Sequence, residues 1–163
     1  MLDIRDAAMA ANLDFLLNTL YPGQKVIVWA HHAHIRYHNQ ATQGNAFWLG
    51  RKTMGGWLKE RPLAAYTIGF YFYRGQIAAN DRQVVDAPPV NSGSLESILY
   101  RAGRKYVFVD LLNQTQQAGN AWMFTAIQAN ELTSGYEPIR LTLRDQYDGL
   151  IFIDTVHPPE YLY

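Results

Sequence analysis

An apolar segment that ends in closely spaced histidines constrains this chain more than any other feature. The segment reads Val26-Ile27-Val28-Trp29-Ala30, and His31, His32 and His34 follow it at once. With His38, four of the five histidines of the chain fall within eight residues. In open α/β sheets, ligands bind beyond the carboxyl ends of the strands. We therefore predict a buried strand over residues 25–30 with a candidate active site at its end.

The composition indicates one soluble domain over residues 1–163. A chain of this length can bury roughly 70% of its unfolded surface. Fourteen basic side chains balance fourteen acidic ones, so we expect neither nucleic acid nor a membrane as a partner. The absence of cysteine excludes disulfides, cysteine nucleophiles and thiolate metal sites. With no signal peptide and no long apolar run, a cytoplasmic location is expected.

Helical and strand patterns alternate along the rest of the chain. Capping residues, apolar spacing and turn signals predict helices over residues 3–20, 54–61 and 95–102. Apolar runs predict strands over residues 66–72, 76–79, 106–109 and 150–153, of which the first two would form a hairpin through Arg74-Gly75. Residues 80–93 are expected to form a loop. The predicted fold is α/β, a mainly parallel sheet covered by helices.

Polar residues that follow the apolar runs are the candidate site residues. Asp110 and Asp154 follow predicted strands as His31 does, so we expect His31 and His34 to lie near one of these aspartates. Together these side chains could supply zinc or manganese ligands, but the spacing specifies no third ligand, and neither a metal site nor a cofactor is predicted. The simpler alternative is that the histidines bind loop carbonyls and the aspartates cap the chain or pair with arginine.

Several motifs along the chain are shared with a known family. They are Arg5-Asp6, Met9, Asn12-Leu13, Trp29-Ala30-His31, His34, Met54-Gly55, Trp57-Leu58, Ile68-Gly69-Phe70, Ser94-Leu95-Glu96 and Tyr147-Asp148-Gly149. On these residues the chain resembles the carboxyl-terminal half of the erythromycin esterase family, over nearly its whole length. The resemblance implies a part of a larger erythromycin-esterase-like fold. The family usually has asparagine where this chain has His32, which leaves His31 and His34 as the paired histidines.

The resemblance also implies half of an active site. The family's general base lies on a Gly-Glu-x-x-His segment of the amino-terminal half, and none of the five glutamates here follows a glycine. We therefore expect Met1 to be a start inside a longer protein. The catalytic residues expected in this chain are His31 and His34, which would polarise an ester carbonyl or position water. Trp29, His32 and Arg74 are expected to bind substrate.

Water-mediated ester hydrolysis is the leading functional hypothesis, with the base supplied by the missing half. The substrate is a small-molecule ester, and a macrolide lactone, as in an antibiotic-resistance enzyme, is one option. The absence of a Gly-x-Ser-x-Gly motif disfavours a serine hydrolase. Two alternatives stay open: a metal-dependent hydrolase on the same scaffold, and a noncatalytic ligand-binding domain. Self-association is expected if the surface left by the missing half is apolar.

Overall fold

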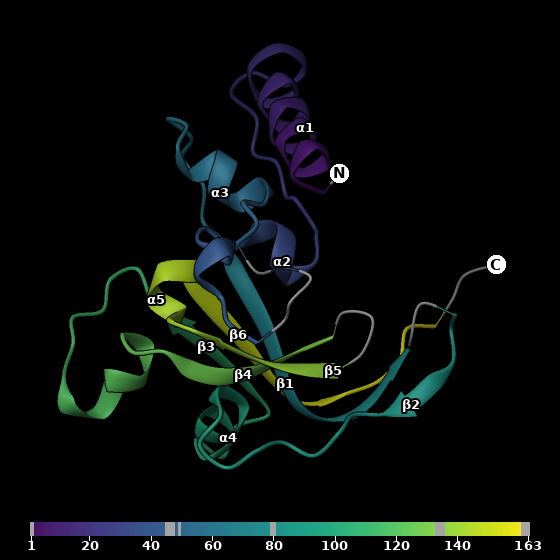
Figure 1. Cartoon of the computed structure of the whole chain (residues 1–163), viewed down its shortest axis with the longest axis vertical. Coiled ribbons are helices and arrows are strands. Elements are labelled where there is room, and N and C mark those ends of the chain that lie inside the picture. Colours follow the sequence, from purple (N-terminus) through teal and green to yellow (C-terminus); the bar gives the residue numbers. More distant parts are fainter. Residues whose placement is uncertain (1, 45–47, 49, 79–80, 133–135, 161–163) are drawn as a thin grey trace.

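The computed structural model describes residues 2–44, 48, 50–78, 81–132 and 136–160, which form a mixed α/β fold (Figure 1). One sheet has four strands in the order β2-β1-β6-β3: β1 (Ile68–Ala78), β2 (Val84–Asp86), β3 (Tyr106–Asp110) and β6 (Gly149–Val156). A separate hairpin consists of β4 (Ile127–Leu132) and β5 (Tyr136–Leu141). The helices are α1 (Leu2–Phe15), extended by a π-helical turn over Leu16–Leu20, then α2 (His32–Ile35), α3 (Met54–Lys59), α4 (Leu95–Tyr100) and α5 (Leu143–Gln146). Short 3₁₀ segments cover Asn39–Ala41 and Ala118–Met123.

The four-stranded sheet is mixed rather than mainly parallel. Strands β1 and β6 are parallel, in register from Ile68 opposite Gly149 to Gly75 opposite Val156. The outer strands β2 and β3 pair antiparallel with β1 and β6 respectively. The α/β prediction is thus confirmed, but the prediction of a mainly parallel sheet is wrong. Periodicity identifies strands and does not specify how they pair.

The predicted hairpin through Arg74-Gly75 is also wrong. Strand β1 continues through this dipeptide to Ala78, and its far end pairs with β2 instead. Gly75 has φ +120°, and a Cβ atom there would lie 2.0 Å from the carbonyl oxygen of Val156. The glycine therefore permits close approach to β6 inside a strand rather than a reversal of the chain.

The predicted buried strand over residues 25–30 is the largest error of the sequence analysis. These residues have no regular secondary structure, and no described strand pairs with them. Ile27 and Trp29 are 93% and 82% exposed. A strand requires a neighbour for its backbone N–H and C=O groups, and an apolar run by itself does not supply one.

The predicted loop over residues 80–93 contains strand β2, whereas α4 and the strands β3 and β6 are confirmed, with different burial. The Ser94 side chain accepts a hydrogen bond from the Ser97 N–H at 3.3 Å and caps α4, and Gly103 adopts φ +63° beyond the end of that helix. Strand β6 is central and fully buries Leu150 and Phe152. Strand β3 forms at the predicted position but lies at the sheet edge.

The hydrophobic core lies between the four-stranded sheet, α4 and the β4-β5 hairpin. Its fully buried members include Leu95, Leu111, Ala129, Leu143, Tyr147, Leu150 and Phe152. Helices α1, α2 and α3 gather at one end of β1, whereas β2 lies at its other end (Figure 1). Across the described ranges, no helix is long and apolar enough to cross a membrane.

A buried ion pair connects α2 to the β4-β5 hairpin. Arg36 caps the end of α2, and its guanidinium lies 3.2 Å from the carboxylate of Glu131 on β4; both side chains are completely buried. The Arg36 Nε also donates to the side chain of Asn39 at 3.0 Å. Removing one member of such a pair leaves an uncompensated buried charge.

We expect Arg36→Met to lower the free energy of unfolding by about 3–5 kcal/mol, because Glu131 would remain charged and buried. The double variant Arg36→Met/Glu131→Leu should recover most of this loss. Urea denaturation of both single variants, the double variant and the parent chain would give the coupling free energy. A loss below about 1 kcal/mol for Arg36→Met would show that the pair does not hold the two elements together.

Candidate functional site

Helix α2 begins at the histidine cluster and directs its histidines to different places. His31 is the N-cap residue, and its Nδ1 accepts a hydrogen bond from the Ala33 N–H at 3.3 Å. Because residues 32–35 are helical, the side chains do not alternate as in a strand. His31 is exposed, His32 turns toward β1 and His34 turns toward α1.

His34 lies between a buried carboxylate and a half-exposed guanidinium. Its Nδ1 is 2.6 Å from Oδ1 of Asp6, and its Nε2 is 2.9 Å from the guanidinium of Arg5. The side chain of Asp6 is 1% exposed, whereas that of Arg5 is 53% exposed. Trp48 packs edge to face against the imidazole, with ring centroids 5.4 Å apart. The cluster thus presents one buried polar wall and one accessible cation.

The two contacts determine the tautomer of His34. Arginine has only donors, so the Nε2 atom that contacts Arg5 must carry a lone pair. The proton is therefore on Nδ1, which donates to Asp6. In this arrangement His34 is a neutral imidazole, oriented by a carboxylate as catalytic histidines commonly are.

Asp6 also connects α1 to α3. Its Oδ1 accepts a second hydrogen bond from the Met54 N–H, the first residue of α3, at 3.0 Å. The next residue, Gly55, lies against α2, where a Cβ atom would be only 2.1 Å from the Ile35 carbonyl oxygen. The carboxylate and the glycine together hold α1, α2 and α3 around His34.

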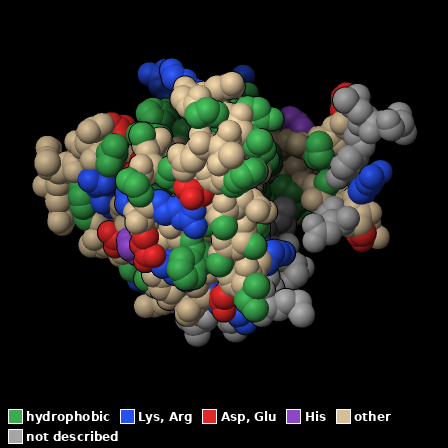
Figure 2. Space-filling model, turned by 90° about the horizontal axis from the view of Figure 1, so that it is seen from above, with side chains coloured by type: hydrophobic (Ala, Val, Ile, Leu, Met, Phe, Trp, Pro, Cys, Tyr) green, Lys and Arg blue, Asp and Glu red, His purple; other side chains and the backbone are tan. Residues whose placement is uncertain are grey.

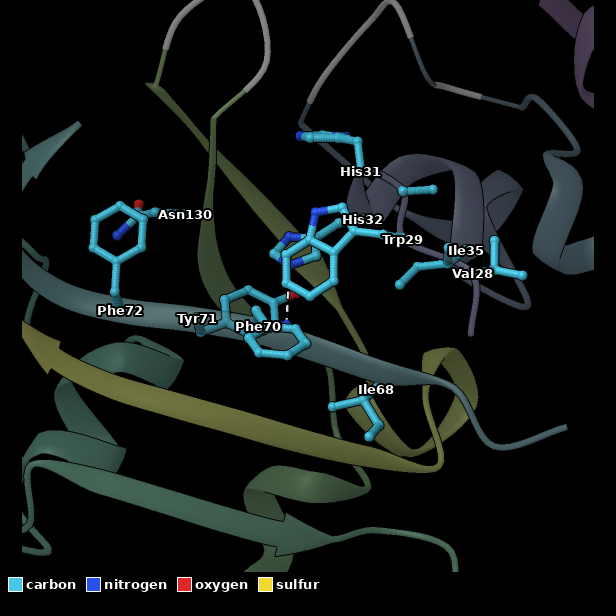
Figure 3. Close-up of a pocket in the computed structure, with 11 residues that line it drawn as sticks. Val28, Trp29, His31, His32, Ile35, Ile68, Phe70, Tyr71, Phe72 and Asn130 are labelled. Carbon is cyan, nitrogen blue, oxygen red and sulfur yellow. Dashed lines mark hydrogen bonds between the residues drawn. The ribbon is translucent and has the colours of Figure 1, made fainter. Parts of the chain in front are cut away.

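A pocket of about 200 Å³ lies beside this cluster, between residues 28–35 and the amino-terminal part of β1. Trp29, His32 and Phe70 occupy its centre, with Val28 and Ile35 on one side and Phe72 and Asn130 on the other (Figure 3). Ala30, His31, Ile68 and Tyr71 complete its lining. The walls are mainly aromatic and aliphatic, as in most small-molecule sites.

The pocket exists because one edge of β1 pairs with another strand over only a short part of its length. Among the described strands, β6 pairs along one side of β1, and β2 covers the other side only from Gln76 to Ala78. The Phe70 N–H on the open edge donates instead to Nε2 of His32 at 3.0 Å. His32 also stacks on Tyr71, with ring centroids 4.8 Å apart.

Burial, together with smaller contributions from the nearby His31 and Arg36, lowers the pKa of His32 from 6.5 to about 3. His32 is therefore neutral near pH 7. Because its Nε2 accepts the Phe70 N–H, the proton must be on Nδ1. Burial also raises the pKa of Tyr147 to about 12 and that of Tyr71 well above its usual range, so both phenols are neutral as well.

The predicted site residues divide into two groups. His31, His32 and Trp29 line the pocket, and His34 lies in the adjoining cluster with Arg5 and Asp6. Arg74 instead pairs with Asp154 at 3.0 Å and is not among the residues that line the pocket. Asp110 accepts hydrogen bonds from Tyr66 and Asn113. We predicted that Asp110 or Asp154 would lie near the two histidines. The carboxylate that contacts His34 is instead that of Asp6.

Ligands for a metal ion do not gather in the described part of the chain. No group of three or more histidine, aspartate or glutamate side chains lies close enough together to hold one ion. His34 and Asp6 form a hydrogen-bonded pair instead.

Arg5-Asp6 is one of the shared motifs, but its part in the site was not predicted from the sequence. A usable signal was present in α1, because Asp6 and Ala10 are four residues apart and therefore lie on one helix face. Among the residues of α1 whose burial is described, Asp6 and Ala10 are the buried ones. An aspartate on the buried face of a helix requires a hydrogen-bonding partner, so its position indicates a polar contact with another part of the chain.

Replacing His32 should alter how stability depends on pH. With a folded-state pKa of about 3 and an unfolded value near 6.5, His32 takes up its proton only on unfolding between these pH values. This uptake should lower the free energy of unfolding of the parent chain by about 2 kcal/mol as the pH falls from 7.5 to 5. It should have no effect above pH 7.5. His32→Asn retains an acceptor for the Phe70 N–H without this titration. Urea unfolding followed by circular dichroism at several pH values should show the two stability curves diverging below pH 6.5; parallel curves would contradict the assignment.

Comparison with known proteins assigns the chain to a family. The erythromycin esterase family model matches residues 1–156. A Bacillus subtilis (strain 168) protein, "Putative hydrolase YbfO", is 38% identical over 159 residues, which are 95% of this chain and 35% of that protein. Two solved structures, a Bacillus cereus protein (TM-score 0.73, 21% identity) and a succinoglycan biosynthesis protein (TM-score 0.77, 18% identity), each match 94% of this chain and 38% of their own. The chain thus spans a little over a third of the length of these proteins. By the match of nearly its whole length to the family model, the chain belongs to the erythromycin esterase family.

Proposed function

We propose that this chain contributes part of the active site of a water-dependent ester hydrolase. The observation that carries the proposal is the Asp6-His34-Arg5 cluster, in which a buried carboxylate fixes the tautomer of an imidazole and an accessible cation adjoins it. A tetrahedral intermediate of ester hydrolysis bears an oxyanion, which the Arg5 guanidinium can stabilise while His34 holds that guanidinium in place. The family and the relative named as a hydrolase support this reaction class.

His34 has an assisting role in this proposal. Arg5 donates to its Nε2, so the lone pair of that atom is engaged and is not free to accept a proton from water. His31 stands at the mouth of the pocket, where it can contact the ester or the attacking water. A separate general base is then required, and we propose that it belongs to the upstream part of a longer protein, of which this chain is the carboxyl-terminal part.

The exposed apolar surface also supports a longer protein. Hydrophobic side chains are scattered over the face that carries α1 (Figure 2). In α1 and the segment that follows it, the exposed large hydrophobic residues include Ile4, Phe15, Leu20, Tyr21, Ile27 and Trp29. The four consecutive apolar residues from Val26 to Trp29 are all exposed, and contiguous exposed apolar residues favour an interface, either with the remaining part of a longer protein or with a second copy.

The 163-residue chain alone should show little esterase activity, whereas a longer protein that includes the family's upstream part should hydrolyse a small ester. General base catalysis contributes a factor of about 10²–10⁴, which the isolated chain would lack. Parallel assays on a panel of small esters and macrolides would test this, with size-exclusion chromatography to detect self-association. Comparable turnover by both proteins would show that the site is complete in this chain.

In the longer protein, His34→Ala should lower kcat/KM about 100-fold, because it removes the imidazole that holds the Arg5 guanidinium in place for the oxyanion. His38→Ala is the matched control, since His38 is an exposed histidine whose side chain lies outside both the cluster and the pocket lining. Steady-state kinetics and circular dichroism on both variants would separate catalysis from folding. Equal activity of the two variants would remove His34 from the mechanism.

A further inference from the structure

The pocket beside His31 has the size and wall chemistry of a site for one apolar ring. Its volume is about 200 Å³, and an apolar protein cavity of roughly 150 Å³ is already enough to bind benzene. Trp29 and Phe70 form an aromatic wall of the pocket, with their rings in contact at a centroid distance of 5.2 Å and a tilt of 54°. A macrolide is too large for this space, which could hold only one portion of it.

The polar groups of the pocket favour a neutral ligand with a hydrogen-bond acceptor. No aspartate, glutamate, lysine or arginine lines it, so a charged ligand would lose its hydration without gaining a counter-charge. His32 contributes to the wall, and in the described part of the chain no residue accepts a hydrogen bond from its Nδ1–H. Asn130, at the other side of the pocket, is 9% exposed and has an Nδ2 atom without a partner among the described residues.

We infer that this pocket binds an uncharged carbonyl compound with a single ring-sized apolar group, and that the His32 Nδ1–H donates to the carbonyl oxygen. The inference rests on the proposed function in one respect, since it names the class of ester that the hydrolase would accept. Binding to the pocket does not itself require hydrolysis. His32 is held for this task from the opposite side, where its Nε2 accepts the Phe70 N–H.

Three probes of nearly equal size separate the contributions of the ring, the neutral acceptor and the charge to binding. Acetophenone carries the ring and a neutral acceptor, ethylbenzene lacks the acceptor, and benzoate replaces it with a charge. Each would be titrated into the ¹⁵N-labelled 163-residue chain while the amide signals of Trp29, Phe70 and Phe72 are followed by NMR. Acetophenone should shift these signals saturably, ethylbenzene should bind about fivefold more weakly for want of one hydrogen bond, and benzoate should leave them unshifted.

Two exposed residues provide the matched variants. Trp29→Ala removes a pocket wall and should weaken acetophenone binding at least fivefold, whereas Ile27→Ala, next but one in the chain and outside the lining, should not. Both side chains are largely exposed, so neither change should unfold the chain. Benzoate binding as tightly as acetophenone, absence of saturation, or insensitivity to Trp29→Ala would overturn the inference. Saturable binding of acetophenone without ester hydrolysis by the longer protein would overturn the proposed function and leave this inference standing.

Discussion

The arrangement of the site depends on one buried carboxylate. Asp6 accepts hydrogen bonds from His34 of α2 and from the Met54 N–H of α3, while it belongs to α1 itself. Burying a charge is costly unless it is hydrogen-bonded, so the three helices must remain together for Asp6 to be tolerated. Helix α1 buries little else, and its position therefore follows from this polar contact more than from an apolar face.

A second set of buried polar contacts places this helical layer on the sheet. Arg36, at the end of α2, pairs with Glu131 on β4, and His32, at its start, accepts the open-edge N–H of Phe70. One short helix is thus fixed at both ends by groups from different strands. The pocket is the space between these contacts. Its polar side chains, His32 and Asn130, belong to residues that also make hydrogen bonds within the fold.

Sequence reasoning located elements well where the signal was local. The Ser94 cap, Gly103 and the apolar run of β6 gave correct positions for α4 and the central strand. It failed for residues 25–30, where an apolar run without a neighbouring strand remained exposed, and for the β4-β5 hairpin, where Asn130 and Glu131 interrupt the apolar pattern. Asn130 lines the pocket and Glu131 pairs with Arg36 at the end of α2, which is why β4 does not have the apolar pattern of a strand.

The sequence alone determined the α/β class, the histidine cluster and the family, because each depends on residue types at fixed spacing along the chain. Only the tertiary structure decided which carboxylate meets which imidazole: Asp6 is 28 residues from His34, and Asp110 and Asp154 were equally plausible by pattern. The same holds for the strand order and for the pocket on the edge of β1. Hydrogen-bond partners and strand neighbours are set by long-range packing, which local periodicity does not encode.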